Sequence, residues 1–132
     1  MPIQLGSAAS IASDVPDRPL IFIVEGRYQN WIKPLILLES LGVKYDIVIL
    51  DGPATRTDWF TALHPQRYVP ALLDGVDGQR TFLWDSSAML EYLAERYDQN
   101  NEWSGRDIKE RNEVSNWLTF ETASLGQVFS VS

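Results

Sequence analysis

Residues 69–84 read VPALLDGVDGQRTFLW and predict an antiparallel β-hairpin. Two apolar runs, 69–73 and 81–84, flank the pair Asp77-Gly78. Asp-Gly between such runs is a strong signal for a tight hairpin turn, because its central residues adopt positive φ angles that this pair tolerates well. The sequence therefore predicts two neighbouring strands in this stretch.

The residues directly after the hairpin predict an amphipathic helix. Asp85, Ser86 and Ser87 carry side-chain oxygens that can accept hydrogen bonds from the first free N–H groups of a helix. An apolar stripe at helical spacing follows, made of Met89, Tyr92, Leu93 and Tyr97. A capping role for the Asp-Ser-Ser string explains it without any ligand, although capping and ligand binding are compatible.

The residues before the hairpin predict a βαβ unit. Residues 20–24, LIFIV, form a continuous apolar run that is typical of a strand buried on both faces. A helix then begins near Asn30, a possible N-cap, and Gly42 stands where a helix C-terminal cap is expected. Residues 43–49 predict a second strand, parallel to the first because a helix joins them.

Changes in composition along the sequence, together with residues that end helices, divide the chain into four parts. Residues 1–18 are rich in small and polar residues and predict a flexible leader. Residues 19–98 form the main domain, which includes a short helix that ends at His64-Pro65. Residues 99–106 are polar and predict a linker, and residues 107–132 begin with a helix that runs to about Leu125.

Composition excludes several classes of function. The chain has 132 residues, 18 acidic against 11 basic, and a net charge of −7, without the basic cluster that nucleic acids require. It has no cysteine, so a disulfide, a cysteine zinc site and a redox reaction through its own thiol are excluded. No apolar stretch approaches the roughly 20 residues that span a bilayer. We expect a cytoplasmic protein with no membrane or nucleic-acid partner and no metal.

Three strings resemble the thioredoxin-like N-terminal domain of glutathione S-transferases. They are residues 64–74, HPQRYVPALLD, residues 83–93, LWDSSAMLEYL, and residues 30–33, NWIK. The resemblance covers about residues 19–126. Within the family, the chain is similar to the fungal branch that includes the yeast nitrogen-regulator protein and transferase-like proteins of secondary-metabolite pathways. The implied fold is α/β: a thioredoxin-like βαβαββα domain followed by the first helix of an incomplete all-α C-terminal domain.

The resemblance implies a glutathione site at two of these strings. Pro70 stands at the position of the family's cis-proline, and Val69 would bind the cysteinyl part of glutathione through its backbone. A trans proline in an ordinary turn is the alternative, since cis bonds are rare. Asp85 would pair with the γ-glutamyl ammonium, while Ser86 and the start of its helix would receive the γ-glutamyl carboxylate.

The thiol and the glycyl carboxylate of glutathione have separate candidate partners. A free thiol has a pKa near 8.5, so a transferase must stabilise the thiolate. At the family's tyrosine-type position stands Val24, which has no donor, and near the serine-type position stands Asn30, with Tyr28 a second candidate. For the glycyl carboxylate the candidates are Arg67, Lys33 and His64, each also consistent with a solvated surface role.

These expectations lead to two hypotheses on function. The first is a transferase that conjugates the glutathione thiol to a small electrophile, in secondary-metabolite biosynthesis or detoxification, with glutathione as co-substrate and no cofactor. The second is a glutathione-binding or regulatory protein without turnover. The resemblance also implies a homodimer for a full-length form. Since the chain ends one helix into the second domain, we expect Trp117, Leu118 and Phe120 to have few packing partners and activity to be impaired.

Overall fold

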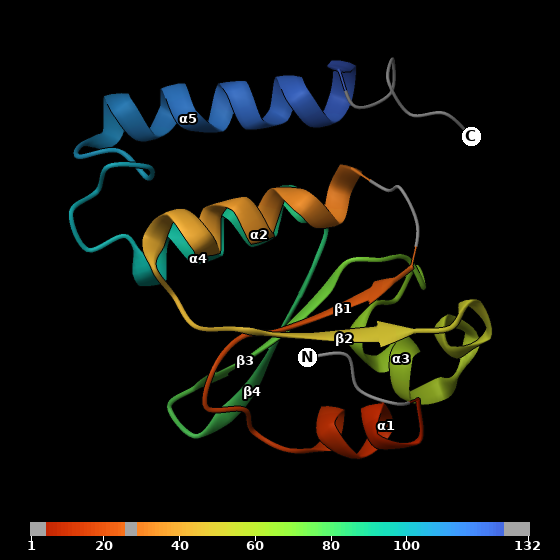
Figure 1. Cartoon of the computed structure of the whole chain (residues 1–132). Coiled ribbons are helices and arrows are strands. Elements are labelled where there is room, and N and C mark those ends of the chain that lie inside the picture. Colours follow the sequence, from red (N-terminus) through yellow and green to blue (C-terminus); the bar gives the residue numbers. More distant parts are fainter. Residues whose placement is uncertain (1–4, 26–28, 126–132) are drawn as a thin grey trace.

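The computed structural model describes residues 5–25 and 29–125, which form a four-stranded mixed sheet with helices on both faces (Figure 1). The strand order is β2-β1-β3-β4. The strands are β1 (Leu20–Val24), β2 (Asp46–Leu50), β3 (Ala71–Val76) and β4 (Gln79–Trp84). β1 pairs with β2 in parallel and with β3 antiparallel, and β3 pairs with β4 antiparallel. The predicted thioredoxin-like domain is confirmed.

The helices form layers above and below this sheet (Figure 1). On one face lie α2 (Gln29–Leu41) and α4 (Ser86–Tyr97), and on the other lie α1 (Leu5–Ser13), the 3₁₀ turn η1 (Gly52–Arg56) and α3 (Asp58–Leu63). The last helix, α5 (Ile108–Phe120), lies beyond α2 and α4 and continues into a π-helical turn, η2 (Glu121–Leu125). In the part of the chain described here, no helix is long and apolar enough to span a bilayer.

β1 is the centre of the core. Its side chains alternate between the two faces, as the period of two in a strand requires. Ile21 and Ile23 pack against α2 and α4, while Leu20 and Phe22 pack against the α1 and α3 side. All four are at most 6% exposed. The prediction of a strand buried on both faces is confirmed.

Both turn signals are confirmed, but the second strand starts later than predicted. Asp77 and Gly78 have φ angles of 51° and 74°, as a tight hairpin requires. Gly42, with φ of 69°, ends α2, and the N–H of Val43 donates to the carbonyl of Leu38 at 3.0 Å. Because this helix cap uses the backbone of Val43, β2 begins only at Asp46.

The prediction of a flexible leader over residues 1–18 is wrong for its central part, which forms α1. Ala8 and Ala12, four residues apart, lie on one helical face and are 0% and 4% exposed. Arg80 Nη1 donates to the carbonyl of Ala12 at 2.8 Å. A Cβ on Gly75 would lie 2.3 Å from the carbonyl oxygen of Pro16, so only glycine permits this contact with β3. Small side chains here indicate close packing rather than disorder.

The link between α4 and α5 is organised by one buried carboxylate. Asp98 is 6% exposed and accepts hydrogen bonds from the backbone N–H groups of Glu102, Trp103 and Ser104, at 2.7–3.0 Å. Burial acts to raise the pKa of Asp98, but these donors outweigh it, and the pKa falls below its usual value. The polar linker predicted over residues 99–106 therefore contains an ordered turn.

A second buried carboxylate, Asp74 on β3, joins the sheet to α4. Its side chain is 2% exposed, and its Oδ2 accepts from the hydroxyls of Tyr92 and Tyr97 at 2.8 and 2.7 Å and from Arg96 Nη1 at 2.8 Å. Its Oδ1 accepts the N–H of Gly75 at 2.9 Å. Burial, acting against the hydrogen bond from Arg96, raises the pKa of Tyr92 to about 12. Both tyrosines thus remain protonated donors.

We predict that Asp74→Asn lowers the free energy of unfolding by about 3 kcal/mol, because it removes the buried charge that satisfies Arg96 and both hydroxyls. Urea unfolding followed by circular dichroism measures this. Asp77→Asn, at the exposed hairpin turn, is the matched control and should change stability by less than about 0.5 kcal/mol. Equal losses in the two variants would contradict a special role for Asp74.

Candidate functional site

A pocket of about 240 Å³ lies where α2 and α4 begin and where the chain enters β3. It gathers most of the residues that the sequence singled out: Asn30, Lys33, His64, Val69, Pro70, Asp85 and Ser86. Arg67 does not line it; this residue is exposed, with a φ of 62°, so its proposed role at the glycyl carboxylate has no geometric support. Tyr28 lies outside the described residues.

Val69 and Pro70 both line the pocket, and the peptide bond between them is cis. The alternative of a trans proline is therefore wrong. The β1–β3 and β3–β4 ladders both begin at Ala71. The N–H and C=O of Val69 thus lie just before the paired part of β3, and Val69 and Pro70 line the pocket.

Asp85 occupies the junction between β4 and α4 in a backbone conformation that is rare outside glycine. Its φ is 93° and its ψ is 123°. Such residues cost about 1–3 kcal/mol and persist where the surrounding structure imposes them, often at ligand sites. The Asp85 carboxylate accepts the N–H of Ser87 at 2.9 Å, so the predicted cap is confirmed. Ser86, the first helical residue, is 8% exposed and lines the pocket.

His64 is buried, whereas the sequence suggested an ordinary loop residue. It follows α3, is 3% exposed, and has Tyr68 and Trp84 as aromatic neighbours at centroid distances of 5.9 and 5.6 Å. Nδ1 accepts the N–H of Gln66 at 3.2 Å, which assigns the proton of a neutral ring to Nε2. Burial lowers the pKa of His64, and the Asp85 carboxylate only partly offsets this. The imidazole is therefore neutral near pH 7.

The start of α2 places Asn30 within the first turn of the helix, not at the N-cap. The helix begins at Gln29, so the capping role considered for Asn30 is not supported. Pro34 lies four residues further on and has no N–H to donate to the Asn30 carbonyl. Asn30 therefore contributes an exposed amide to the pocket and a carbonyl without its usual helical donor. Val24, at the end of β1, is partly buried.

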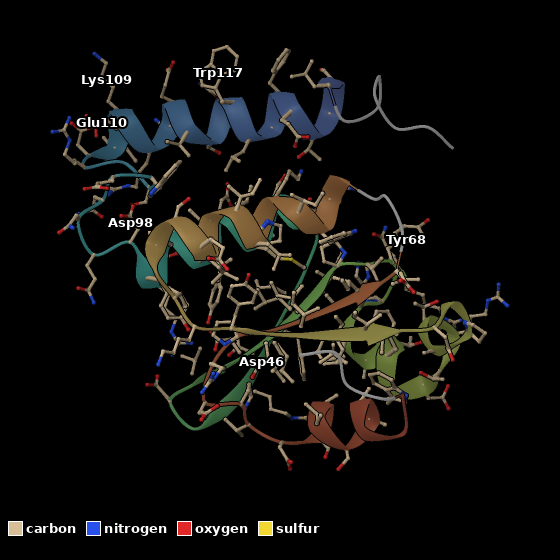
Figure 2. All side chains as sticks on the ribbon, in the orientation of Figure 1. Asp46, Tyr68, Asp98, Lys109, Glu110 and Trp117 are labelled. Atoms are coloured by element: carbon tan, nitrogen blue, oxygen red, sulfur yellow. The ribbon has the colours of Figure 1, made fainter. Side chains whose placement is uncertain are left out.

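Four lining residues were not predicted: Gln66, Tyr68, Glu121 and Thr122. Figure 2 shows Tyr68 at the end of the sheet where β1 finishes and α2 begins. Glu121 Oε2 lies 2.7 Å from Lys33 Nζ, and the Thr122 hydroxyl contacts that of Ser87. The η2 turn thereby forms one wall of the pocket. No local sequence signal identifies it, because Glu121 is 88 positions from Lys33.

Within residues 5–25 and 29–125, no group of three or more carboxylate or imidazole side chains is placed to hold a metal ion. The site instead offers groups suited to a peptide: a strand start, a helix N-terminus, the Asp85 carboxylate, a neutral imidazole and the paired charges of Lys33 and Glu121.

Comparison with known proteins identifies a family to which this sequence is similar. Residues 32–96 match the family described as glutathione S-transferase, N-terminal domain. Glutathione S-transferase verG of Clonostachys rogersoniana is 62% identical over 126 residues, which are 96% of this chain and 53% of that protein. Residues 32–96 of this chain are a glutathione S-transferase N-terminal domain.

Two further proteins are similar to this chain. The structure of Ure2p in complex with glutathione superposes with a TM-score of 0.78 at 26% identity, over 92% of this chain and 52% of that one. The trimodular acetylaranotin synthesis protein ataIMG of Aspergillus terreus is 38% identical over 104 residues, which cover 77% of this chain and 11% of that protein. The chain spans about half the length of verG.

We predict a pH dependence of stability that belongs to His64, the only histidine in the sequence. The unfolded imidazole titrates near 6.5, and in the folded protein its pKa is lower. Between these values the unfolded state binds more protons, so stability is full above about pH 6.5 and is lost as the pH falls below it.

Urea unfolding at several pH values between about 5.5 and 7.5 tests this, in a range where carboxylates remain ionised. His64→Gln should flatten the slope, whereas Tyr68→Phe, which keeps the imidazole, should retain it. A His64→Gln protein with the original slope would show that another group is responsible.

Proposed function

We propose that this domain binds glutathione in the 240 Å³ pocket and that the protein conjugates the glutathione thiol to an electrophile. One observation carries the proposal: a single pocket brings together Val69-Pro70, Asp85-Ser86 and Asn30, which lie far apart in sequence. The three groups suit three parts of glutathione: the cysteinyl backbone, the γ-glutamyl end and the thiol. Together they support glutathione as the ligand better than any one of them alone.

The cysteinyl part of glutathione binds the backbone of Val69 in this proposal. Val69 precedes the first ladder residue, Ala71, so its N–H and C=O lie outside the strand pairing of β3. An extended peptide can add to such a strand start through main-chain hydrogen bonds. The contribution of Val69 is then insensitive to its side chain.

The γ-glutamyl end binds the junction of β4 and α4. One oxygen of Asp85 already caps the N–H of Ser87, and its other oxygen is available for an ammonium group. The Ser86 hydroxyl and the free N–H groups of the first turn of α4 receive the carboxylate, which the helix dipole also favours. The ammonium of the ligand thus meets a carboxylate, and the carboxylate of the ligand meets the positive end of a helix dipole.

The glycyl carboxylate binds the ring N–H of His64 in our assignment. The neutral imidazole carries its proton on Nε2, because Nδ1 is occupied by the N–H of Gln66. Lys33 also lines the pocket, but its ammonium group already pairs with Glu121 at 2.7 Å. The ring N–H of His64 can therefore donate without breaking an existing ion pair, whereas Lys33 would first have to leave Glu121.

The thiol lies beside Asn30 at the start of α2. The side-chain amide donates to sulfur, and the N-terminal end of the helix favours a negative charge. A neutral amide stabilises a thiolate less than a cation does, so we expect modest activation. Lowering a thiol pKa by one unit corresponds to about 1.4 kcal/mol.

We predict that Asp85→Asn and Ser86→Ala each weaken glutathione binding by about ten- to one hundredfold, since each removes a charge-assisted contact worth about 1.5–3 kcal/mol. Isothermal titration calorimetry measures the dissociation constant. Asparagine retains the capping oxygen and tolerates a positive φ angle, so Asp85→Asn preserves the fold. Asp77→Asn is the matched control. Unchanged affinity in both site variants would refute the assignment.

A specific observation favours the second function, a binding or regulatory protein without turnover. Among the described residues that line the pocket, the thiol candidate is an uncharged amide, and the nearby cation Lys33 is paired with Glu121. Val24, at the end of β1, supplies no side-chain donor. Such a site can hold glutathione firmly while activating its thiol only weakly.

We predict that Asn30→Ala lowers the kcat/KM for conjugation of a generic electrophile by about tenfold, with glutathione affinity changed less than about twofold, because the amide acts on the thiolate. Steady-state kinetics and calorimetry on the same preparations provide the two values. Asn112→Ala, on an exposed position of α5, is the control. Tight glutathione binding with no conjugation in the unaltered protein would support the regulatory function instead.

We further propose that the electrophile is an intermediate of fungal secondary metabolism. The support is the relative whose name assigns it to acetylaranotin synthesis and the 62% identity to a fungal glutathione S-transferase. The proposal extends to a small second substrate, because Asn30, beside which we place the thiol, is exposed.

A further inference from the structure

An ion pair crosses the boundary of the proposed glutathione pocket. Lys33 Nζ on α2 and Glu121 Oε2 on η2 are 2.7 Å apart, and the two side chains are only 21% and 32% exposed. Lys33 also lines a second, larger hollow of about 710 Å³ between α2, α4 and α5. The pair therefore stands between the two pockets and joins the last turn of the structure to the first turns of α2.

The position of Lys33 relative to Asn30 gives this pair a chemical consequence. The two residues are three positions apart on α2, so they lie on the same face about one turn, or roughly 5 Å, apart along the axis. Both line the 240 Å³ pocket. A thiol bonded to the Asn30 amide would therefore share this pocket with the charge of Lys33, and a nearby charge shifts a thiol pKa.

We infer that the Lys33–Glu121 pair sets the ionisation of the bound glutathione thiol, with Glu121 as a positioning residue that acts through Lys33. The inference rests on the proposed binding of glutathione and names the group that regulates its reactivity. While the pair is formed, the ammonium and carboxylate charges nearly cancel at the thiol. Any electrophile that draws Glu121 away leaves a cation beside the sulfur and favours the thiolate.

The η2 turn is built to hold Glu121 in this place. The Thr122 hydroxyl contacts the Ser87 hydroxyl at the start of α4, so η2 is attached to both helices that frame the pocket. A π-helical turn has wider hydrogen bonding than an α-helix and is found frequently at functional sites. The carboxylate thereby reaches a cation that belongs to a distant part of the sequence.

Within residues 5–25 and 29–125, three other charged or titratable side chains line the pocket, and none of them replaces this pair. They are Asp85 at the β4–α4 junction, His64 after α3 and Tyr68 before β3. Asp85 caps α4 and is assigned to the γ-glutamyl ammonium, and His64 is neutral near pH 7 because burial lowers its pKa. Among the described lining residues, Lys33 is therefore the one cation, and in our inference Glu121 sets how much of its charge the thiol experiences.

The test is a charge-neutralisation cycle on this chain, using glutathione itself as the probe. The pKa of the bound thiol is read from the ultraviolet absorbance of the thiolate as a function of pH. Glu121→Gln should lower that pKa by about one unit and Lys33→Met should raise it by about one, at the lower end of the range for close charges because the pair is partly exposed. The double variant should return to within about 0.3 of the original value.

Controls separate this role from a structural one. Lys109→Met and Glu102→Gln make the same charge changes at exposed positions away from the pocket; Figure 2 shows Lys109 at the far end of α5. Neither should move the thiol pKa. If Glu121→Gln and Lys33→Met lower the melting temperature but leave the thiol pKa unchanged, the pair only attaches α5 to α2, and the inference is overturned.

Calorimetry distinguishes this failure from failure of the proposed function. If the unaltered protein does not bind glutathione, the proposed function is wrong and the inference falls with it. If glutathione binds with the predicted dependence on Asp85 and Ser86 while the thiol pKa ignores Glu121 and Lys33, only the role of the ion pair is refuted.

Discussion

The buried carboxylate of Asp74 holds the two halves of the site in register. A charge at 2% side-chain exposure is tolerated only if strong donors surround it, and here two tyrosine hydroxyls and one arginine on α4 do so. Because β3 begins beside Val69-Pro70 and α4 begins at Ser86, docking α4 onto β3 places the strand start next to the helix start.

The site uses the ends of elements, where backbone groups are not consumed by helix or sheet. Val69 precedes the ladders of β3, and the first turn of α4 retains free N–H groups beside Ser86. Asp85 maintains this junction with a φ of 93°, a conformation that the hairpin on one side and the cap on the other impose together. The candidate site therefore combines main-chain groups with a few side chains, an arrangement suited to the extended peptide that we propose as its ligand.

Charge in the pocket is balanced across distant segments. His64 is kept neutral by burial among aromatic rings, and Lys33 is paired with Glu121 from the last turn of the structure. In the function we propose, the two carboxylates of glutathione would bind here without a concentrated positive field. The same proposal makes thiol activation depend on one amide and one ion pair, which connects the catalytic and regulatory hypotheses through the same side chains.

The sequence by itself determined the succession of helices and strands along the chain, the hairpin at Asp77-Gly78 and the capped start of α4. These features depend on neighbours within a few residues. Resemblance to the family supplied most of the site residues. Only the tertiary structure decided the packing of Ala8 and Ala12 and the burial of His64. It also decided which donors surround Asp74 and that Lys33 pairs with Glu121. These contacts join segments separated by up to 88 positions, and the local patterns in the chain contain no signal for which distant partner satisfies a given charge.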